Sequence, residues 1–190
     1  MLTTINIKNG TIEVISDDVF ALNGFVSFME NEAPIIYAND KVGFFIVTQR
    51  ELMKAYAFLD KEKFFFKRNN IIFFICHDSL WKIIDGVDNG RFNFLSVNSS
   101  LDIMYNTLKT KLGKLGFQGE DVNTHKRLTF CQSRLLYFYL KGYSPHIISD
   151  VLGVSEKTIS SHKRAIMKKY GISSTMELLM KFNFIKRIGL

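Results

Sequence analysis

The stretch SEKTISSHKRAIMKKYGI (residues 155–172) decides the fold of the last third of the chain. Its apolar residues Ile159, Ile166 and Tyr170 are seven and four positions apart. This spacing predicts one helix with an apolar side packed on its own domain and a basic, hydroxyl-rich side left free. A surface helix with a merely solvated charged side would have the same pattern, so the preceding residues must decide between the two interpretations.

The preceding residues carry the start and stop signals of a short helix. Ser144 and Pro145 suit its N-cap and first position, Gly153 suits its end, and Ser155 suits the N-cap of the basic helix. Its predicted apolar stripe consists of Ile147, Ile148, Val151 and Leu152. A short helix and a longer basic helix joined by a tight turn containing glycine are typical of a helix-turn-helix.

Two further helices flank this pair. Thr129 followed by Gln132 is a capping-box pattern, and Gly142 suits the end of the helix that it starts. The stretch GISSTMELLMKFNFI (171–185) supplies a turn and a fourth helix. The sequence therefore predicts an all-α domain of four helices over residues 127–190.

The order of these signals resembles the LuxR-type (FixJ/NarL-like) DNA-binding domain across some 55 residues. The resemblance rests on Leu128-Thr129, Gly142 and SEKTISSH (155–162), and the basic helix is similar to that of the Rcs capsule-synthesis regulators. Residues 130–132 depart from the usual proline-arginine-glutamate of the family, at positions that serve capping. The resemblance implies a transcription regulator that binds double-stranded DNA through a recognition helix at about 156–170 in the major groove.

The resemblance also implies which side chains touch DNA. Ser160, Ser161 and Arg164 match the positions that read base edges, and an arginine can pair with guanine through two hydrogen bonds. His162 suits either a phosphate contact or local packing, and no Cys or His partner gives it metal-ligand spacing. Phosphate contacts are expected from Lys157, Thr158, Lys163, Lys168 and Lys169.

Upstream, short apolar runs alternate with helical segments, which predicts an α/β domain with a five-stranded, doubly wound parallel sheet. The predicted strands are TIEVIS (11–16), PIIYA (34–38), VGFFIVT (42–48), NIIFFIC (70–76) and RFNFLSV (91–97). The predicted helices lie at about 18–30, 50–60, 79–87 and 100–113.

This alternation resembles the receiver domain of response regulators. The resemblance implies an acidic pair after strand one, an aspartate phosphoacceptor after strand three, a hydroxyl after strand four and a lysine after strand five. The residues found at the first three places are Asp17 and Asp18, then Thr48 or Gln49, then Cys76 and His77. Strand five ends FLSVN, without a lysine. Phosphoryl transfer needs a carboxylate nucleophile and Mg²⁺ needs several oxygen ligands, so we expect a receiver-like domain that is not phosphorylated.

Charge follows the same division. Residues 127–190 hold 11 lysines and arginines against 3 acidic residues, whereas residues 1–126 hold 14 against 15. The stretch GKLGFQGEDVNTHKR (113–127) lacks helical periodicity and reads as a linker. The sequence therefore predicts a regulatory domain at 1–112, a linker at 113–126 and a DNA-binding domain at 127–190.

Several classes of protein are disfavoured. No secretory leader, bilayer-spanning run, glycine-rich phosphate loop or catalytic constellation is visible, so we expect a cytoplasmic protein without enzymatic activity, metal or cofactor. Cys76 and Cys131 are expected to be small buried thiols. The phenylalanine-rich runs, including FFFKR (64–68), are expected in the core, with a dimer interface as the alternative for residues 64–66.

Two alternatives concern regulation. The missing phosphoacceptor suits either a homodimer or an auxiliary subunit that forms heterodimers with a related LuxR-type regulator. The other alternative is a ligand-sensing LuxR-type regulator whose N-terminal domain binds a small molecule. The single Trp81 and only about 112 residues of fold argue against an aromatic ligand pocket.

Overall fold

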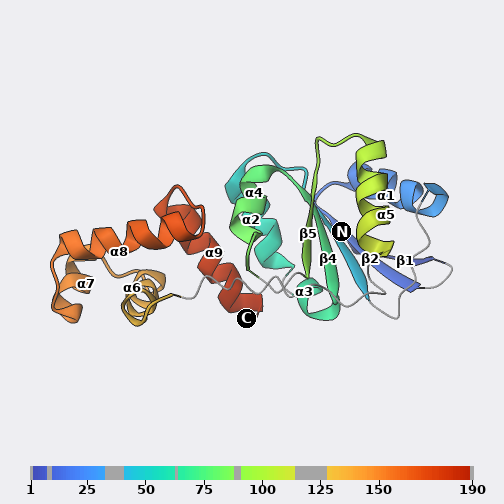
Figure 1. Cartoon of the computed structure of the whole chain (residues 1–190). Helices are drawn as coiled ribbons and strands as arrows, with labels where there is room; N and C mark the ends of the chain where they lie inside the picture. The colour runs from blue at the N-terminus through green and yellow to red at the C-terminus, as the bar shows by residue number, and fades with distance from the viewer. Residues whose placement is uncertain are drawn as a thin grey trace. The chain divides into compact units, whose positions relative to one another are not determined.

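The computed structural model describes residues 2–7, 10–32, 41–62, 64–87, 91–113 and 128–188. The chain divides into two compact units, residues 1–122 and 123–190. The first contains a sheet with helices and the second contains helices (Figure 1).

The sheet of the N-terminal unit has the strand order β1-β2-β3-β4-β5. Its first strand is antiparallel to the second, and each later neighbour is parallel. The strands are β1 (Leu2–Ile7), β2 (Gly10–Ser16), β3 (Val42–Ile46), β4 (Ile71–Cys76) and β5 (Phe92–Ser96).

The predicted fold class is confirmed, with one difference at the edge of the sheet. Four of the predicted strands are present and parallel, the predicted strand at 34–38 lies outside the described residues, and β1 was not predicted. Only two residues separate β1 from β2, and a parallel connection needs a dozen or more, so β1 must pair antiparallel.

Helices cover both faces of the sheet (Figure 1). Neighbouring side chains on a strand point to opposite faces: Phe44 contacts Phe25 with ring centroids 4.8 Å apart, and Phe45 contacts Phe58 at 5.1 Å. On the face of Phe44 lie α1 (Val19–Glu32) and α5 (Leu101–Gly113), and on the other face lie α2 (Leu52–Lys61), α3 (Phe65–Arg68) and α4 (Asp78–Ile84).

Two of the three phenylalanines of the FFFKR run belong to the core, as predicted. Phe65 and Phe66 are each 1% exposed, whereas Phe64 is 64% exposed. Phe65 and Phe66 open the four-residue helix α3, which is too short for periodicity to reveal and was not predicted.

The C-terminal unit consists of the four predicted helices, and its caps confirm the signals in the sequence. Gln132 N–H donates to Thr129 Oγ1 at 3.3 Å and Thr129 N–H donates to Gln132 Oε1 at 3.0 Å, which completes the capping box. Gly153 is the C-cap of the second of these helices and has the left-handed conformation, with φ of 65°. The helices are α6 (Phe130–Leu140), α7 (Pro145–Leu152), α8 (Glu156–Lys169) and α9 (Thr175–Ile188).

The core of this unit forms where α6, α7, α8 and α9 meet. Ile148, Ile159 and Ile166 are fully buried there. The predicted apolar stripe of α7 was only partly right, because Ile147 is 44% and Val151 is 53% exposed. A helix of eight residues buries one narrow side here, and residues 147 and 151 lie one turn apart on the side that faces away.

The two cysteines differ. Cys76 is buried, and burial together with the nearby Asp78 raises the pKa of its thiol to about 12. Cys131 is exposed in the first turn of α6, so the expectation of a buried thiol was wrong for it.

We predict that a disulfide reagent at pH 8 modifies one thiol per native chain, because the reactive thiolate of Cys76 is scarce and shielded. Counting modified thiols before and after adding denaturant, with Cys131→Ser as control, checks this.

None of the helices in the described ranges is long and apolar enough to cross a membrane.

Candidate nucleic-acid interface

Helix α8 has two distinct sides. Ile159 and Ile166 are 0% exposed and anchor the buried side. On the opposite side five exposed residues follow one another at helical spacing, and we call them the exposed α8 face: Lys157, Ser161, Arg164, Ala165 and Lys168. This face carries three positive charges and no acidic residue, so it suits a polyanion.

Ala165 belongs to this face although it was not among the predicted site residues. It lies four residues after Ser161, one turn further along the same side of the helix. That spacing was the signal that could have identified it. A methyl group in this position suits an apolar contact with thymine.

Three of the predicted residues lie at the flanks of the exposed face. Ser160 is half-buried, and its carbonyl accepts a hydrogen bond from Arg164 Nε at 3.3 Å. Thr158 is half-buried, with its Oγ1 3.0 Å from the hydroxyl of the N-cap residue Ser155. Lys169 is also half-buried. These side chains border the exposed α8 face.

His162 and Lys163 lie on the side of α8 that faces its own domain. Lys163 Nζ donates to Thr175 Oγ1 at 3.2 Å and lies 5.8 Å from the ring centre of Tyr139. His162 lines a small cavity of about 80 Å³ together with Cys131 and other residues of α6 and α7. The structure therefore separates these two residues from the other predicted contacts.

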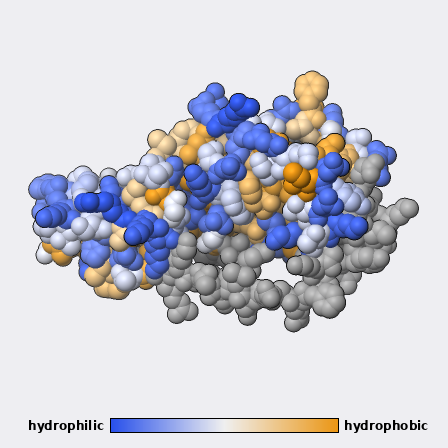
Figure 2. All heavy atoms as spheres, turned by 45° about the horizontal axis from the view of Figure 1, so that its top comes forward, coloured by the Kyte–Doolittle hydropathy of each residue, from blue (hydrophilic) through white to orange (hydrophobic). Residues whose placement is uncertain are grey.

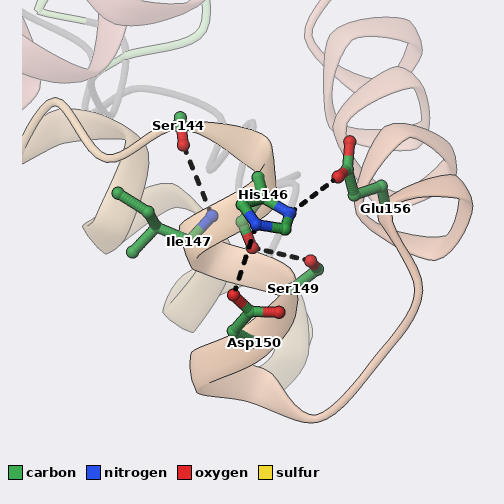
Figure 3. A network of polar contacts seen from close by, with 6 residues as sticks. All are labelled: Ser144, His146, Ile147, Ser149, Asp150 and Glu156. Carbon is green, nitrogen blue, oxygen red and sulfur yellow. Dashed lines mark hydrogen bonds and ion pairs between the residues drawn. The ribbon is translucent and has the colours of Figure 1, made fainter.

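Polar contacts connect α7 to the first turn of α8 (Figure 3). His146 Nδ1 lies 3.0 Å from Glu156 Oε1 in the first turn of α8, and His146 Nε2 lies 3.7 Å from Asp150 Oδ2 on α7. Ser149 Oγ donates to the carbonyl of His146 at 2.7 Å. These side chains link the first turn of α8 to α7, and because exposed ion pairs add little stability, the fold does not depend on them.

The N-terminal unit has a second polar site at the carboxyl ends of its strands. Asp17 Oδ1 accepts hydrogen bonds from Thr48 N–H at 2.9 Å and Thr48 Oγ1 at 3.1 Å, and Asp17 Oδ2 accepts one from Gln49 N–H at 3.2 Å. Asp18 Oδ1 accepts from Ala21 N–H at 2.8 Å and caps α1. Both carboxylates therefore accept hydrogen bonds from the backbone, and Thr48 and Gln49 are the polar residues that follow β3.

The capped short helix, the tight turn at Gly153 and the longer helix with a free basic face define a helix-turn-helix DNA-binding unit. Residues 122–182 match the family described as bacterial regulatory proteins, luxR family. This part of the chain is thus a LuxR-type helix-turn-helix domain, as its sequence predicted.

Two solved structures are similar to the chain over most of its length. A structure of two RcsB dimers bound to two parallel DNAs has a TM-score of 0.54 at 17% identity, and the match covers 91% of this chain and 97% of that chain. A structure of the two-component response regulator RcsB–DNA complex has a TM-score of 0.50 at 20% identity, with the same coverage. The fold is that of a receiver-like unit followed by a helix-turn-helix unit, and the helix-turn-helix unit is the part that matches the family of bacterial regulatory proteins.

Proposed function

We propose that this protein regulates transcription by sequence-specific binding, with α8 in the major groove of double-stranded DNA. The observation that carries the proposal is the exposed α8 face, which is basic and lies on the opposite side of the helix from the fully buried Ile159 and Ile166. A helix fits the major groove, which is about 12 Å wide.

The residues on and beside the exposed α8 face are proposed to have separate roles in binding DNA. Arg164 is proposed to pair with guanine, while Ser161 and Ala165 are small enough to let the helix approach the bases, with Ser160 at the flank. Lys157 and Lys168 are proposed to contact phosphates, helped at the flanks by Thr158 and Lys169. For His162 and Lys163 we propose a supporting role inside the domain, because their contacts are with α6 and α9.

Arg164→Ala is expected to remove preference for one base pair of the binding site, at a cost of about 1–3 kcal/mol for the preferred sequence. Lys168→Ala should weaken binding to all sequences alike and reduce the slope of log affinity against log salt by about 0.9. Selection of binding sites from random DNA, followed by titration at several salt concentrations, measures both quantities.

Arg187→Ala on α9 is the matched control, since it removes the same charge outside α8. Unchanged affinity and unchanged base preference in Arg164→Ala would show that the exposed α8 face does not read the sequence.

For the N-terminal unit we propose a receiver-like fold that accepts no phosphoryl group and mediates dimerisation. The support is chemical: Thr48 or Gln49 stands where a receiver has its phosphoacceptor, and the Asp17 carboxylate already accepts hydrogen bonds from both residues. A related LuxR-type regulator is the alternative dimer partner. We place this activity in the cytoplasm, where promoters are accessible.

Radiolabelled acetyl phosphate is expected to leave no stable label on the protein. In a separate experiment, Asp17→Ala is expected to lower the free energy of unfolding by about 2 kcal/mol. The reason is that Asp17 binds two backbone amides and one hydroxyl at the end of β3. Urea titration measures the loss, with the exposed Asp102→Ala as control. Stable labelling of the wild type would refute the proposal.

A further inference from the structure

An apolar cavity opens on the N-terminal unit between α1, α5 and the carboxyl ends of β3, β4 and β5. Its volume is about 240 Å³, and Thr48 is the polar residue of an otherwise apolar lining. Gly24 and Phe25 of α1 and Leu101 and Met104 of α5 contribute to it. None of the lining residues is charged.

The cavity lies beside a change in the winding of the sheet. β2 and β3 are parallel neighbours, but α1 follows β2 onto one face of the sheet and α2 follows β3 onto the other (Figure 1). In open α/β sheets, ligands bind at the carboxyl ends of the strands next to such a point. Thr48 stands two residues after β3 and lines the cavity. The topology therefore places the cavity where folds of this class take a ligand.

The chain does not fill this space with its own side chains, although protein interiors contain few hollows larger than a water molecule. Gly24 lines the cavity, and a Cβ there would meet no heavy atom within 4 Å beyond the adjacent helical turns. Leu101, also in the lining, is 64% exposed. Figure 2 shows apolar side chains over the N-terminal unit within a largely hydrophilic surface. The cavity is thus open to a molecule from outside.

The chemistry of the lining limits the kind of molecule that fits. A bound water needs about two to four polar partners, and the lining offers one polar side chain, so water is a poor occupant. An ion would lose its hydration without meeting an opposite charge. The lining therefore suits a neutral, largely apolar molecule.

The volume sets the size of that molecule. An apolar cavity of about 150 Å³ holds one benzene ring, so the larger cavity here accommodates a ring with a short side chain. Although the sequence argued against an aromatic ligand pocket, Phe25 and Phe28 both line the cavity, with ring centroids 6.1 Å apart. Aromatic rings pack favourably against one another, which favours an aromatic occupant.

Thr48 determines the polar group of the occupant. Its hydroxyl donates to Asp17 Oδ1 at 3.1 Å, so the hydroxyl hydrogen is already engaged. A threonine oxygen that donates in this way keeps its lone pairs and can still accept a hydrogen bond. A molecule recognised by Thr48 therefore carries a hydrogen-bond donor.

We propose that this cavity is a binding site for a small, neutral aromatic alcohol whose ring lies among the apolar side chains and whose hydroxyl donates to Thr48. The bound molecule contacts α1, α5 and the segment after β3, and so connects three separate elements of the N-terminal unit. This proposal goes beyond the proposed function, because neither DNA binding nor dimerisation requires an occupied cavity.

Titration of the full chain with 2-phenylethanol, followed by NMR of labelled methionine methyl groups, tests the proposal. Met104 lines the cavity and is 8% exposed, whereas Met53 of α2 lies on the other face of the sheet and is 51% exposed. The Met104 signal, identified by Met104→Leu, is expected to shift with a dissociation constant of about 0.1–1 mM. The Met53 signal should stay in place.

Two analogues of the probe test the chemistry of the site. Ethylbenzene lacks the hydroxyl and is expected to bind about 3–10-fold more weakly than 2-phenylethanol. Phenylacetate carries a charge and should bind more than about 10-fold more weakly. Thr48→Val should remove the difference between 2-phenylethanol and ethylbenzene, because it removes the accepting oxygen and keeps the shape of the side chain.

Gly24→Leu tests the position of the site. The leucine side chain fills the open space and is expected to weaken 2-phenylethanol binding at least about 10-fold. Asn23→Leu is the matched control, since it adds the same side chain at the neighbouring exposed position outside the lining, and it should leave the affinity unchanged. Circular dichroism of each variant checks the fold.

Three results would overturn the proposal: a Met104 signal that does not move, equal shifts of Met104 and Met53, or an affinity that Gly24→Leu leaves unchanged. An affinity that falls as the protein concentration rises would also overturn it, because another protein molecule would then cover the cavity. Arg164→Ala separates this proposal from DNA recognition, since that variant should bind the probe as the wild type does while losing its base preference.

Discussion

Gly43→Val is expected to lower the free energy of unfolding of the N-terminal unit by about 3 kcal/mol or more. Gly43 lies in the fully buried strand β3, paired with Glu13 of β2 and Ile72 of β4. A Cβ at residue 43 would lie 2.7 Å from Phe65 Cζ and 2.8 Å from Asn69 Cγ. Both neighbours would have to move.

Neither neighbour can move freely. Phe65 is 1% exposed and Asn69 is 2% exposed. Asn69 Nδ2 donates to Glu13 Oε2 and to the carbonyl of Phe65, both at 3.0 Å. Gly43 therefore makes the space in which α3 docks on the sheet, and a larger residue displaces that contact.

The sign of this effect separates packing from strand propensity. Valine is favoured over glycine in strands by up to about 1 kcal/mol, so propensity alone predicts stabilisation. The clash with Phe65 and Asn69 is larger and opposite. Gly24→Ala, where a Cβ has open space, should instead stabilise the unit by about 0.5–1 kcal/mol.

Trp81 provides the measurement. It is the single tryptophan of the chain and stacks on Phe94 with ring centroids 5.2 Å apart, so its fluorescence follows the N-terminal unit. Urea titration of Gly43→Val, Phe65→Ala and the double variant gives a thermodynamic cycle. We expect the double variant to lose less than the two single losses added together, because truncating Phe65 removes the clash. Strict additivity would show that Phe65 is not the obstacle.

The local signals predicted the C-terminal unit well. Each capping residue contacts groups only a few positions away in the chain, so capping geometry follows from sequence order alone. These residues are Thr129, Ser144, Pro145, Gly153 and Ser155. Burial needs the neighbouring helices as well. This is why Ile147 and Val151 were expected inside although they are exposed.

In the N-terminal unit the buried strands were evident because they are continuous hydrophobic runs. β1 was not evident, since its pairing partner is set by the length of the connection to β2. The space at Gly43 also depends on α3, which lies more than twenty residues later in the chain. Contacts of this kind are absent from any periodic pattern.

The candidate site shows the same division. Periodicity identified five residues as one side of a helix, and the structure places all but the half-buried Ser160 in the exposed α8 face: Lys157, Ser160, Ser161, Arg164 and Lys168. Charge alone could not show that Lys163 turns inward, because its partners come from other helices: Thr175 belongs to α9 and Tyr139 to α6.

Ile166→Ala is expected to lower the free energy of unfolding of the C-terminal unit by about 2–5 kcal/mol and to weaken DNA binding in proportion to the unfolded fraction. Ile166 is 0% exposed and lies opposite the exposed α8 face, in contact with the core that α6 and α9 share. A small domain is stable by only about 5 kcal/mol, so a loss of this size leaves much of it unfolded at physiological temperature.

Thermal unfolding followed by far-ultraviolet circular dichroism measures the loss of helix, while Trp81 fluorescence in the same sample should melt as in the wild type. Ile166→Val removes one methylene and should cost only about 0.5–1.5 kcal/mol, with DNA affinity nearly retained. Lys168→Ala provides the converse control, because it removes an exposed charge and should weaken DNA binding without lowering the melting temperature. If Ile166→Ala bound DNA as the wild type does while Lys168→Ala melted early, the two sides of α8 would have been assigned the wrong way round.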